Sequence, residues 1–111
     1  MRIKGTPPQV GDIVLTDIVS FVTENLGYDP ETVAGVYLNW YKNGSDFTPN
    51  HSHKDTVQII VSLGSKRTLT VGKKEYPQKS GTVTVFGASV HGVPKSDSIE
   101  GRISIAIFID K

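Results

Sequence analysis

The spacing of apolar residues predicts one helix near the start of the chain. Between residues 16 and 26 they recur every three or four positions, which is the spacing of an amphipathic helix. The expected apolar face carries Ile18, Phe21, Val22 and Leu26. Thr16 or Asp17 is suited to cap the helix N-terminus, and Gly27 is suited to end it. A second, short helical turn is expected at Asp29-Pro30-Glu31, because proline fits the first position of a helix.

After Val33 the apolar residues mostly alternate with polar ones, which is the pattern of β-strands. Turn signals rich in Gly, Lys, Ser and Asn separate the alternating runs. These runs predict six strands, at residues 34–41, 47–53, 56–63, 67–72, 82–86 and 102–109. Short strands after one or two helices predict a mainly β fold, either a small sandwich or a jelly roll.

Alternation in the last predicted strand separates an apolar face from a polar one. One face carries Ile103, Ile105, Ile107 and Ile109. The other carries Arg102, Ser104 and Ala106, followed by Phe108. We interpret the isoleucine face as core and the opposite face as a cavity wall that receives an anion. Asn39 and Tyr41 likewise share a face, away from their apolar neighbours.

Composition narrows the class of protein. The chain has 111 residues and shows no repeat or linker, so residues 1–111 are expected to form a single domain. Apolar residues make up 37% and charged residues 21%, which argues against disorder. The absence of cysteine excludes disulfides and thiolate metal sites and fits a reducing, cytoplasmic location. We expect no membrane partner, because neither a signal peptide nor a membrane span is recognisable.

The three histidines are placed as a metal site requires. His51 and His53 are two residues apart, so on a strand both imidazoles point to one side. His91 follows a predicted strand, between Gly87 and Gly92. A His-x-His pair with one distant histidine can hold a divalent transition metal and leave coordination positions open. The spacing does not choose between iron, copper, zinc and nickel, and histidines that lie in loops without a metal also show it.

Six segments resemble the AlkB-like branch of the iron(II)- and 2-oxoglutarate-dependent dioxygenases. The first contains the Asn39-Trp40-Tyr41 stretch and is similar to the family's Asn-x-Tyr-x-x-Gly-x-Asp pattern. The fifth, His91-Gly92-Val93-Pro94, is similar to the family's His-x-Val-Pro. The six occur in the family's order, at residues 38–46, 51–55, 62–67, 81–85, 91–94 and 102–105.

This resemblance implies a double-stranded β-helix that binds Fe(II) and 2-oxoglutarate. His51 and His91 would be iron ligands, and Asn39, Tyr41 and Arg102 would bind the cosubstrate. Arg102 would pair with the distal carboxylate, and Ser104 would add a hydrogen bond on the same wall. The substrate would be hydroxylated or demethylated, and the family implies a nucleic-acid base. The net charge of +1 gives nucleic-acid binding little support.

Three features depart from the family. His53 stands where the family has aspartate, so the metal ligands become His51, His53 and His91. Phe108 stands where the family usually has a second arginine. Loss of the carboxylate together with that arginine avoids burying one charge without the other. Because only 38 residues precede Asn39, we expect the family's N-terminal nucleotide-recognition lid to be largely absent.

Three alternatives remain open at this point, one for the metal ligands and two for the function. In a different register His53 and Asp55 form the His-x-Asp pair, and the metal ligands become His53, Asp55 and His91. The spacing from Tyr41 favours His51 as the first ligand, which leaves Asp55 near the opening as a substrate contact.

A small cupin is the other main interpretation. Its first motif is approximated by Gly44, His51, His53, Gln58 and Gly64, and its second by Gly81, Gly87 and His91. Gln58 then stands in place of the usual glutamate. This interpretation keeps the three histidines but predicts no 2-oxoglutarate. A noncatalytic metal-binding module is the third interpretation, which the histidine at position 53 and Phe108 favour.

Overall fold

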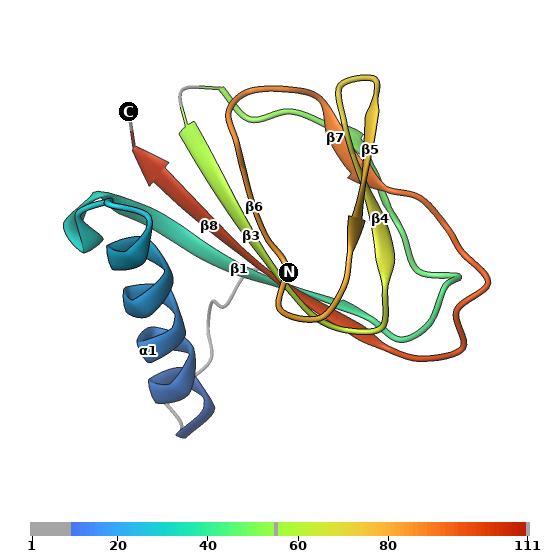
Figure 1. Ribbon diagram of the computed structural model, residues 1–111, viewed down its shortest axis with the longest axis horizontal. Helices are drawn as coiled ribbons and strands as arrows, with labels where there is room; N and C mark the ends of the chain where they lie inside the picture. Colours follow the sequence, from blue (N-terminus) through green and yellow to red (C-terminus); the bar gives the residue numbers. More distant parts are fainter. Residues whose placement is uncertain (1–9, 55, 111) are drawn as a thin grey trace.

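Two four-stranded antiparallel sheets face each other and enclose the interior of a barrel (Figure 1). The computed structural model describes residues 10–54 and 56–110. One sheet has the strand order β1-β8-β3-β6 and the other the order β2-β7-β4-β5. The elements are α1 (Val10–Asn25), the 3-10 helix η1 (Pro30–Thr32), β1 (Val33–Tyr41), β2 (Thr48–His51), β3 (Thr56–Gly64), β4 (Arg67–Val71), β5 (Lys74–Gln78), β6 (Val83–Phe86), β7 (His91–Val93) and β8 (Arg102–Asp110).

This architecture confirms the prediction of a mainly β double-stranded β-helix with one or two N-terminal helices. Neighbouring strands within each sheet come from distant parts of the sequence, as a jelly roll requires. Figure 1 shows α1 on the face of the first sheet that points away from the second sheet. Among the described residues, no helix has the length and apolar character needed to cross a membrane.

Helix α1 ends as expected but begins earlier. Gly27 adopts a φ of 82°, which glycine reaches without strain, and its N–H donates to the Glu24 carbonyl at 3.1 Å. The Tyr28 N–H donates to the Thr23 carbonyl at 2.9 Å, which completes a Schellman C-cap. The expectation that residue 16 or 17 caps the N-terminus was wrong, because the helix begins at Val10. Both residues lie inside the helix and are exposed.

The apolar face of α1 is rotated from the one predicted. Leu15, Ile18, Val19 and Val22 pack against the outer face of the first sheet. Phe21 is 68% exposed and Leu26 is 42% exposed, so neither belongs to the packed face as predicted. At about 100° per residue, Leu15, Ile18 and Val22 cluster on one side of the helix and Phe21 falls outside that cluster.

Strand β8 is buried on both faces, as its alternation predicts. Ile105, Ile107 and Ile109 face outward into the cluster covered by α1. Ala106 and Phe108 face inward, where they pack with the core inside the barrel. Ile103 is 36% exposed at the end of the isoleucine face. The interior of the barrel is therefore lined by the face that carries Arg102, Ser104 and Ala106.

Three β segments differ from the prediction. Strand β5 was missed, because four of its five residues are exposed and Pro77 interrupts the pattern at the edge of its sheet. The predicted strand at 47–53 ends at His51, so His53 lies beyond β2. Residues 91–93 form the short strand β7 rather than a loop. The other predicted strands match within one residue at each end.

Candidate metal centre

The three histidines converge at one place inside the barrel. Strands β2 and β7 pair so that His51 stands opposite His91. The ring centroid of His51 lies 4.3 Å from that of His91 and 4.9 Å from that of His53. One ring nitrogen from each histidine lies within 4.8 Å of the other two. The structure therefore brings together the three residues that the sequence singled out.

Two of the three imidazoles are oriented by backbone carbonyls. Nδ1 of His51 donates to the Pro49 carbonyl at 2.8 Å, and Nδ1 of His91 donates to the Ser89 carbonyl at 2.9 Å. A carbonyl oxygen only accepts, so the proton of each neutral ring is placed on Nδ1. Nε2 is then left with its lone pair free, which is the arrangement found at histidine metal ligands.

The surroundings favour the neutral form of two rings. Burial lowers the pKa of His91, the Ser89 carbonyl partly offsets this, and the two other histidines lower it further. The pKa of His53 is also lowered, first by burial and then by His51. A neutral imidazole is the form that binds a metal ion, so these shifts favour coordination near neutral pH.

The donor set fits a transition-metal ion. Two nitrogens that are each about 2.1 Å from one tetrahedral ion lie about 3.4 Å apart. The three ring nitrogens lie within 4.8 Å of one another, so the widest pair has to close by up to about 1.4 Å, which side-chain rotations provide. Three neutral nitrogen donors suit iron, copper, zinc and nickel alike.

Aromatic side chains pack against two of the histidines. The Phe108 ring lies 4.9 Å from the His53 ring and 4.9 Å from the Tyr37 ring. The Phe86 ring lies 4.7 Å from the His91 ring. In the AlkB-like resemblance Phe108 is notable only as the replacement of an arginine, and its contact with His53 was not predicted.

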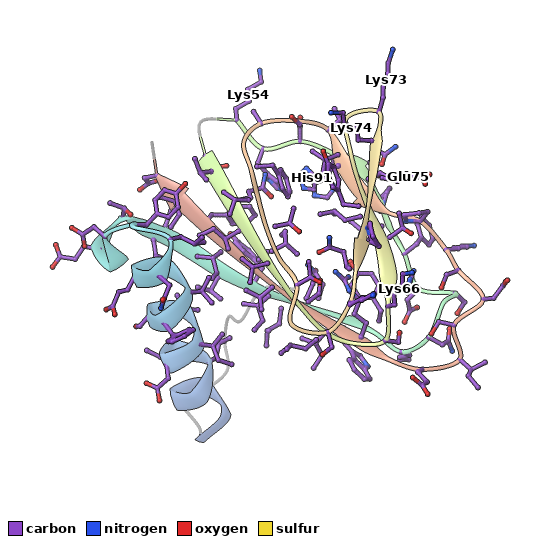
Figure 2. The ribbon with its side chains drawn as sticks, viewed as in Figure 1. Lys54, Lys66, Lys73, Lys74, Glu75 and His91 are labelled. Atoms are coloured by element: carbon purple, nitrogen blue, oxygen red, sulfur yellow. The ribbon has the colours of Figure 1, made fainter. Side chains whose placement is uncertain are left out.

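The histidines open onto a cavity of about 680 Å³. Figure 2 places His91 toward the end of the barrel at which Lys54 also lies, and both residues line the cavity. The cavity walls include every predicted site residue that the structure describes: Asn39, Tyr41, His51, His53, His91, Arg102 and Ser104. Asp55 falls outside the described residues, as does the alternative ligand set that depends on it.

Strand register explains how the predicted cosubstrate residues meet. In the β1–β8 pair, Asn39 stands opposite Ser104 and Tyr41 stands opposite Arg102. The Asn39 amide donates to Ser104 Oγ at 3.3 Å, and the Tyr41 hydroxyl shares a hydrogen bond of 2.6 Å with Thr48. These side chains form one polar wall because paired residues of an antiparallel ladder point to the same face.

Arg102 is a buried cation without a carboxylate partner in the described part of the chain. It is 1% exposed, and its Nη2 donates to Ser62 Oγ at 2.7 Å. Its Nε and Nη1 are buried and have no hydrogen-bond partner. Burial lowers its pKa, Tyr41 raises it and Arg67 lowers it. The guanidinium lies 5.1 Å from the centre of the Tyr41 ring.

A buried polar network behind Arg102 was not predicted. Ser62 Oγ donates to Gln78 Oε1 at 3.1 Å, and Gln78 Nε2 donates to Thr84 Oγ1 at 3.0 Å. Ser62 and Gln78 are each 1% exposed. Ser62 could have been noticed as a polar residue within an apolar strand, but Gln78 lies on the strand that the pattern missed.

Arg67 has a different environment from Arg102. Its Nη1 donates to the Asn43 carbonyl at 3.2 Å, and its Nη2 donates to the carbonyls of Asp46 and Pro94 at 2.7 and 2.8 Å. Arg67 therefore ties the β1–β2 connection to the segment after β7, which is a structural role.

In the cupin interpretation of the sequence, Gln58 stands in place of the glutamate of the first motif. It lines the cavity, is 1% exposed, and donates from Nε2 to the Gly87 carbonyl at 3.3 Å. The amide nitrogen is thus engaged, and the carbonyl oxygen is the end of the side chain that remains for a ligand. Unlike glutamate, Gln58 brings no negative charge to the site.

Comparison with solved structures identifies the fold. A protein from Thermotoga maritima described as a predicted oxalate decarboxylase superposes with a TM-score of 0.64, at 16% identity, over 80% of this chain and 74% of that one. A double-stranded β-helix protein from Klebsiella pneumoniae gives 0.63, at 16% identity, over 71% and 69%. A cupin 2 conserved barrel protein from Salinispora arenicola gives 0.54, at 19% identity, over 77% and 71%.

No protein-family model and no curated protein matches the sequence. The structural similarities establish a cupin-type double-stranded β-helix, and the histidines add a candidate metal site within it. The AlkB-like resemblance is supported only in this shared fold, because nothing in the comparisons points to that family specifically. At these identities the similarity carries the fold and not the activity.

Proposed function

We propose that this protein is a cupin-type metalloenzyme that binds a divalent transition metal through His51, His53 and His91 and acts on a small organic anion. The observation that carries the proposal is the convergence of three ring nitrogens within 4.8 Å at the wall of a cavity. A site with three protein ligands leaves positions open for substrate, as catalytic rather than purely structural sites do.

Fe(II) is the metal that we propose for the working enzyme. When bound, iron would supply a Lewis acid and reactivity toward dioxygen. The chain itself contributes neutral ligands, so the ion keeps its charge of +2 and attracts anions. Where the barrel walls bury a charged group such as Arg102, the lower local dielectric strengthens its electrostatic interactions.

The substrate anion is proposed to bind Arg102. Two nitrogens of its guanidinium lack partners, and the described lining of the cavity contains no carboxylate that competes for it. Asn39, Tyr41 and Ser104 line the same wall and supply hydrogen-bonding groups of fixed orientation. These residues bind and orient the anion, and the histidines hold the metal.

A 2-oxoglutarate-dependent oxygenase is a second candidate, and the polar wall around Arg102 is the observation that favours it. In this case 2-oxoglutarate would be the anion, and Arg102 would bind its distal carboxylate. Asp55 would contact the substrate. A nucleic-acid base as that substrate rests on family resemblance alone, and the net charge of +1 adds no support.

Metal analysis followed by calorimetric titration tests both candidates. The metal-loaded protein is titrated with 2-oxoglutarate, malonate and oxalate, and succinate release is measured with iron and ascorbate. Lys54→Ala is the matched control for Arg102→Ala, because Lys54 is an exposed cation that also lines the cavity. Arg102→Ala should weaken the preferred acid at least about 10-fold, since a charge-assisted hydrogen bond is worth about 1.5–3 kcal/mol.

Each outcome selects one function. Tight binding of 2-oxoglutarate with succinate release identifies the oxygenase, whereas binding of another acid without 2-oxoglutarate identifies a different cupin-type enzyme. Metal binding without affinity for any acid indicates a noncatalytic metal-binding module. Absence of stoichiometric metal in the wild-type protein overturns the proposal.

A further inference from the structure

The three histidines are not held equally. His51 and His91 lie on paired strands, and each ring donates from Nδ1 to a carbonyl, at 2.8 and 2.9 Å. His53 lies beyond the end of β2, and no hydrogen bond to its ring occurs within the described part of the chain. Hydrogen bonds to the far ring nitrogen normally orient a metal-bound histidine, so His53 lacks the support that the other two have.

A hydrophobic contact replaces the missing hydrogen bond. The ring of His53 is tilted by 56° against the ring of Phe108, with 4.9 Å between centroids. Phe108 is in turn held edge-to-face by Tyr37, also at 4.9 Å. Such a contact limits where the ring lies, but it fixes neither the tautomer nor the direction of the coordinating nitrogen as a hydrogen bond does.

We propose that His53 is the exchangeable ligand of the metal, positioned by Phe108, and that a substrate with two donor atoms displaces it while His51 and His91 stay bound. The inference rests on the proposed metal site and goes beyond it, because it assigns unequal roles to the ligands. Release of His53 would free a coordination position for the second donor atom of a chelating anion. The released His53 ring would keep its contact with Phe108.

Phe86 supplies a matched control for Phe108. Its ring lies 4.7 Å from the ring of His91, nearly the same distance as that between Phe108 and His53. The difference is that the His91 ring is also anchored by the Ser89 carbonyl. If the aromatic contact matters only where no hydrogen bond exists, the two phenylalanines should behave differently when each is replaced by leucine.

The first experiment measures Zn(II) affinity by competition with a chromophoric chelator. We expect Phe108→Leu to weaken Zn(II) by about 2- to 12-fold, the range that an aromatic contact represents, and Phe86→Leu to weaken it less. In a His53→Ala background, Phe108→Leu should have no further effect on Zn(II) affinity. An equal loss for both leucine variants, or an unchanged loss in the His53→Ala background, overturns the positioning role of Phe108.

The second experiment observes displacement directly. The chain contains three histidines, so the imidazole ¹⁵N NMR spectrum of the labelled protein holds three sets of signals. Each set is assigned in the metal-free protein by its alanine variant and is then followed through loading of the wild type with Zn(II). Titration with oxalate should return the coordinating nitrogen of His53 to its metal-free shift and leave His51 and His91 bound. Retention of the bound His53 shift up to the highest oxalate concentration overturns the inference, as does earlier release of His51 or His91.

The two proposals fail in different ways. If the wild-type protein does not bind Zn(II) or Fe(II) stoichiometrically, the metal centre itself is wrong, and the exchangeable ligand with it. If the metal binds but the three histidines respond alike to oxalate, the metal centre stands and only the unequal roles are refuted.

Discussion

Replacement of Arg102 by methionine should separate a binding residue from a structural one. The guanidinium is 1% exposed, and its buried Nε and Nη1 have no partner. A buried cation without a counter-ion costs several kcal/mol of desolvation, and each unpaired buried donor costs about 1–3 kcal/mol. Against this stand one charged hydrogen bond to Ser62, worth about 1.5–3 kcal/mol, and a contact with the Tyr41 ring, worth about 2 kcal/mol.

The costs at the low end of their ranges nearly equal the gains at the high end of theirs, so the balance favours the apolar side chain. Methionine keeps most of the volume, and Ser62 retains its hydrogen bond to Gln78. We therefore expect Arg102→Met to leave the metal-free protein as stable as the wild type or more stable by about 1 kcal/mol. For a domain of this size, 1 kcal/mol corresponds to a rise in Tm of about 4–8 °C. The same variant should bind the preferred organic acid at least about 10-fold more weakly.

Arg67→Met is the control for the same chemical change at a structural arginine. Arg67 is 2% exposed, but its guanidinium donates to three carbonyls that would lose their donor. Since each loss of a buried partner costs about 1–3 kcal/mol, we expect a destabilisation of at least about 3 kcal/mol. Thermal and urea unfolding measure the change in the free energy of unfolding of both variants. A loss of about 3 kcal/mol with Arg102→Met, together with unchanged acid affinity, would show that Arg102 is structural too.

Three further predictions concern the metal. His51→Ala and His91→Ala should each abolish stoichiometric iron binding, whereas Asp55→Ala should not. If metal analysis shows that Asp55→Ala loses iron and His51→Ala keeps it, the ligands are those of the alternative register, in which Asp55 binds the metal. His53→Asp should retain the metal but bind a carboxylate less tightly in calorimetry, because the site loses one unit of positive charge, and an unchanged affinity would contradict this. Gly92→Ala should lower both Tm and metal affinity, since a Cβ there would lie 2.8 Å from the Thr48 carbonyl and push β2 away from β7. Wild-type metal affinity in a chelator competition assay would refute this prediction.

Alternation predicted the faces of β8 because that strand is buried on both sides by different partners. Ile105 and Ile107 meet the helix, and Ser104 and Ala106 meet the cavity, so each face carries its own chemistry. The same rule failed for β5, whose residues are mostly exposed and carry no alternating signal. Helix periodicity predicted the end of α1 but not its start at Val10. The exposed side chain of Phe21 shows that the buried face depends on the sheet on which the helix packs.

The sequence predicted which residues form the metal site but not how each histidine ring is held. The chain holds three histidines, and the motif around them was sufficient to group them. His51 and His53 do not share one face of a strand as predicted, because β2 ends at His51. The anchoring carbonyls of Pro49 and Ser89 and the contact with Phe108 arise from backbone path and strand register. None of these leaves a pattern in a single sequence.

The charges that line the cavity should couple the binding of a metal at the histidines to the binding of an anion at Arg102. Its described lining carries the cations Arg102 and Lys54 and no carboxylate, and the amide of Gln58 brings no charge. A bound metal would add two further positive charges to this wall. An organic anion that contacts both Arg102 and the metal offsets this repulsion, so metal and anion should each bind more tightly when the other is present.

Thermodynamic linkage makes this coupling between metal and anion reciprocal, and couplings between sites are commonly about 1–3 kcal/mol. Zn(II) affinity measured with and without saturating acid should therefore rise by about 5- to 150-fold in the wild type, and by much less in Arg102→Met. An equal gain in both proteins would mean that the acid binds the metal alone and that Arg102 plays no part.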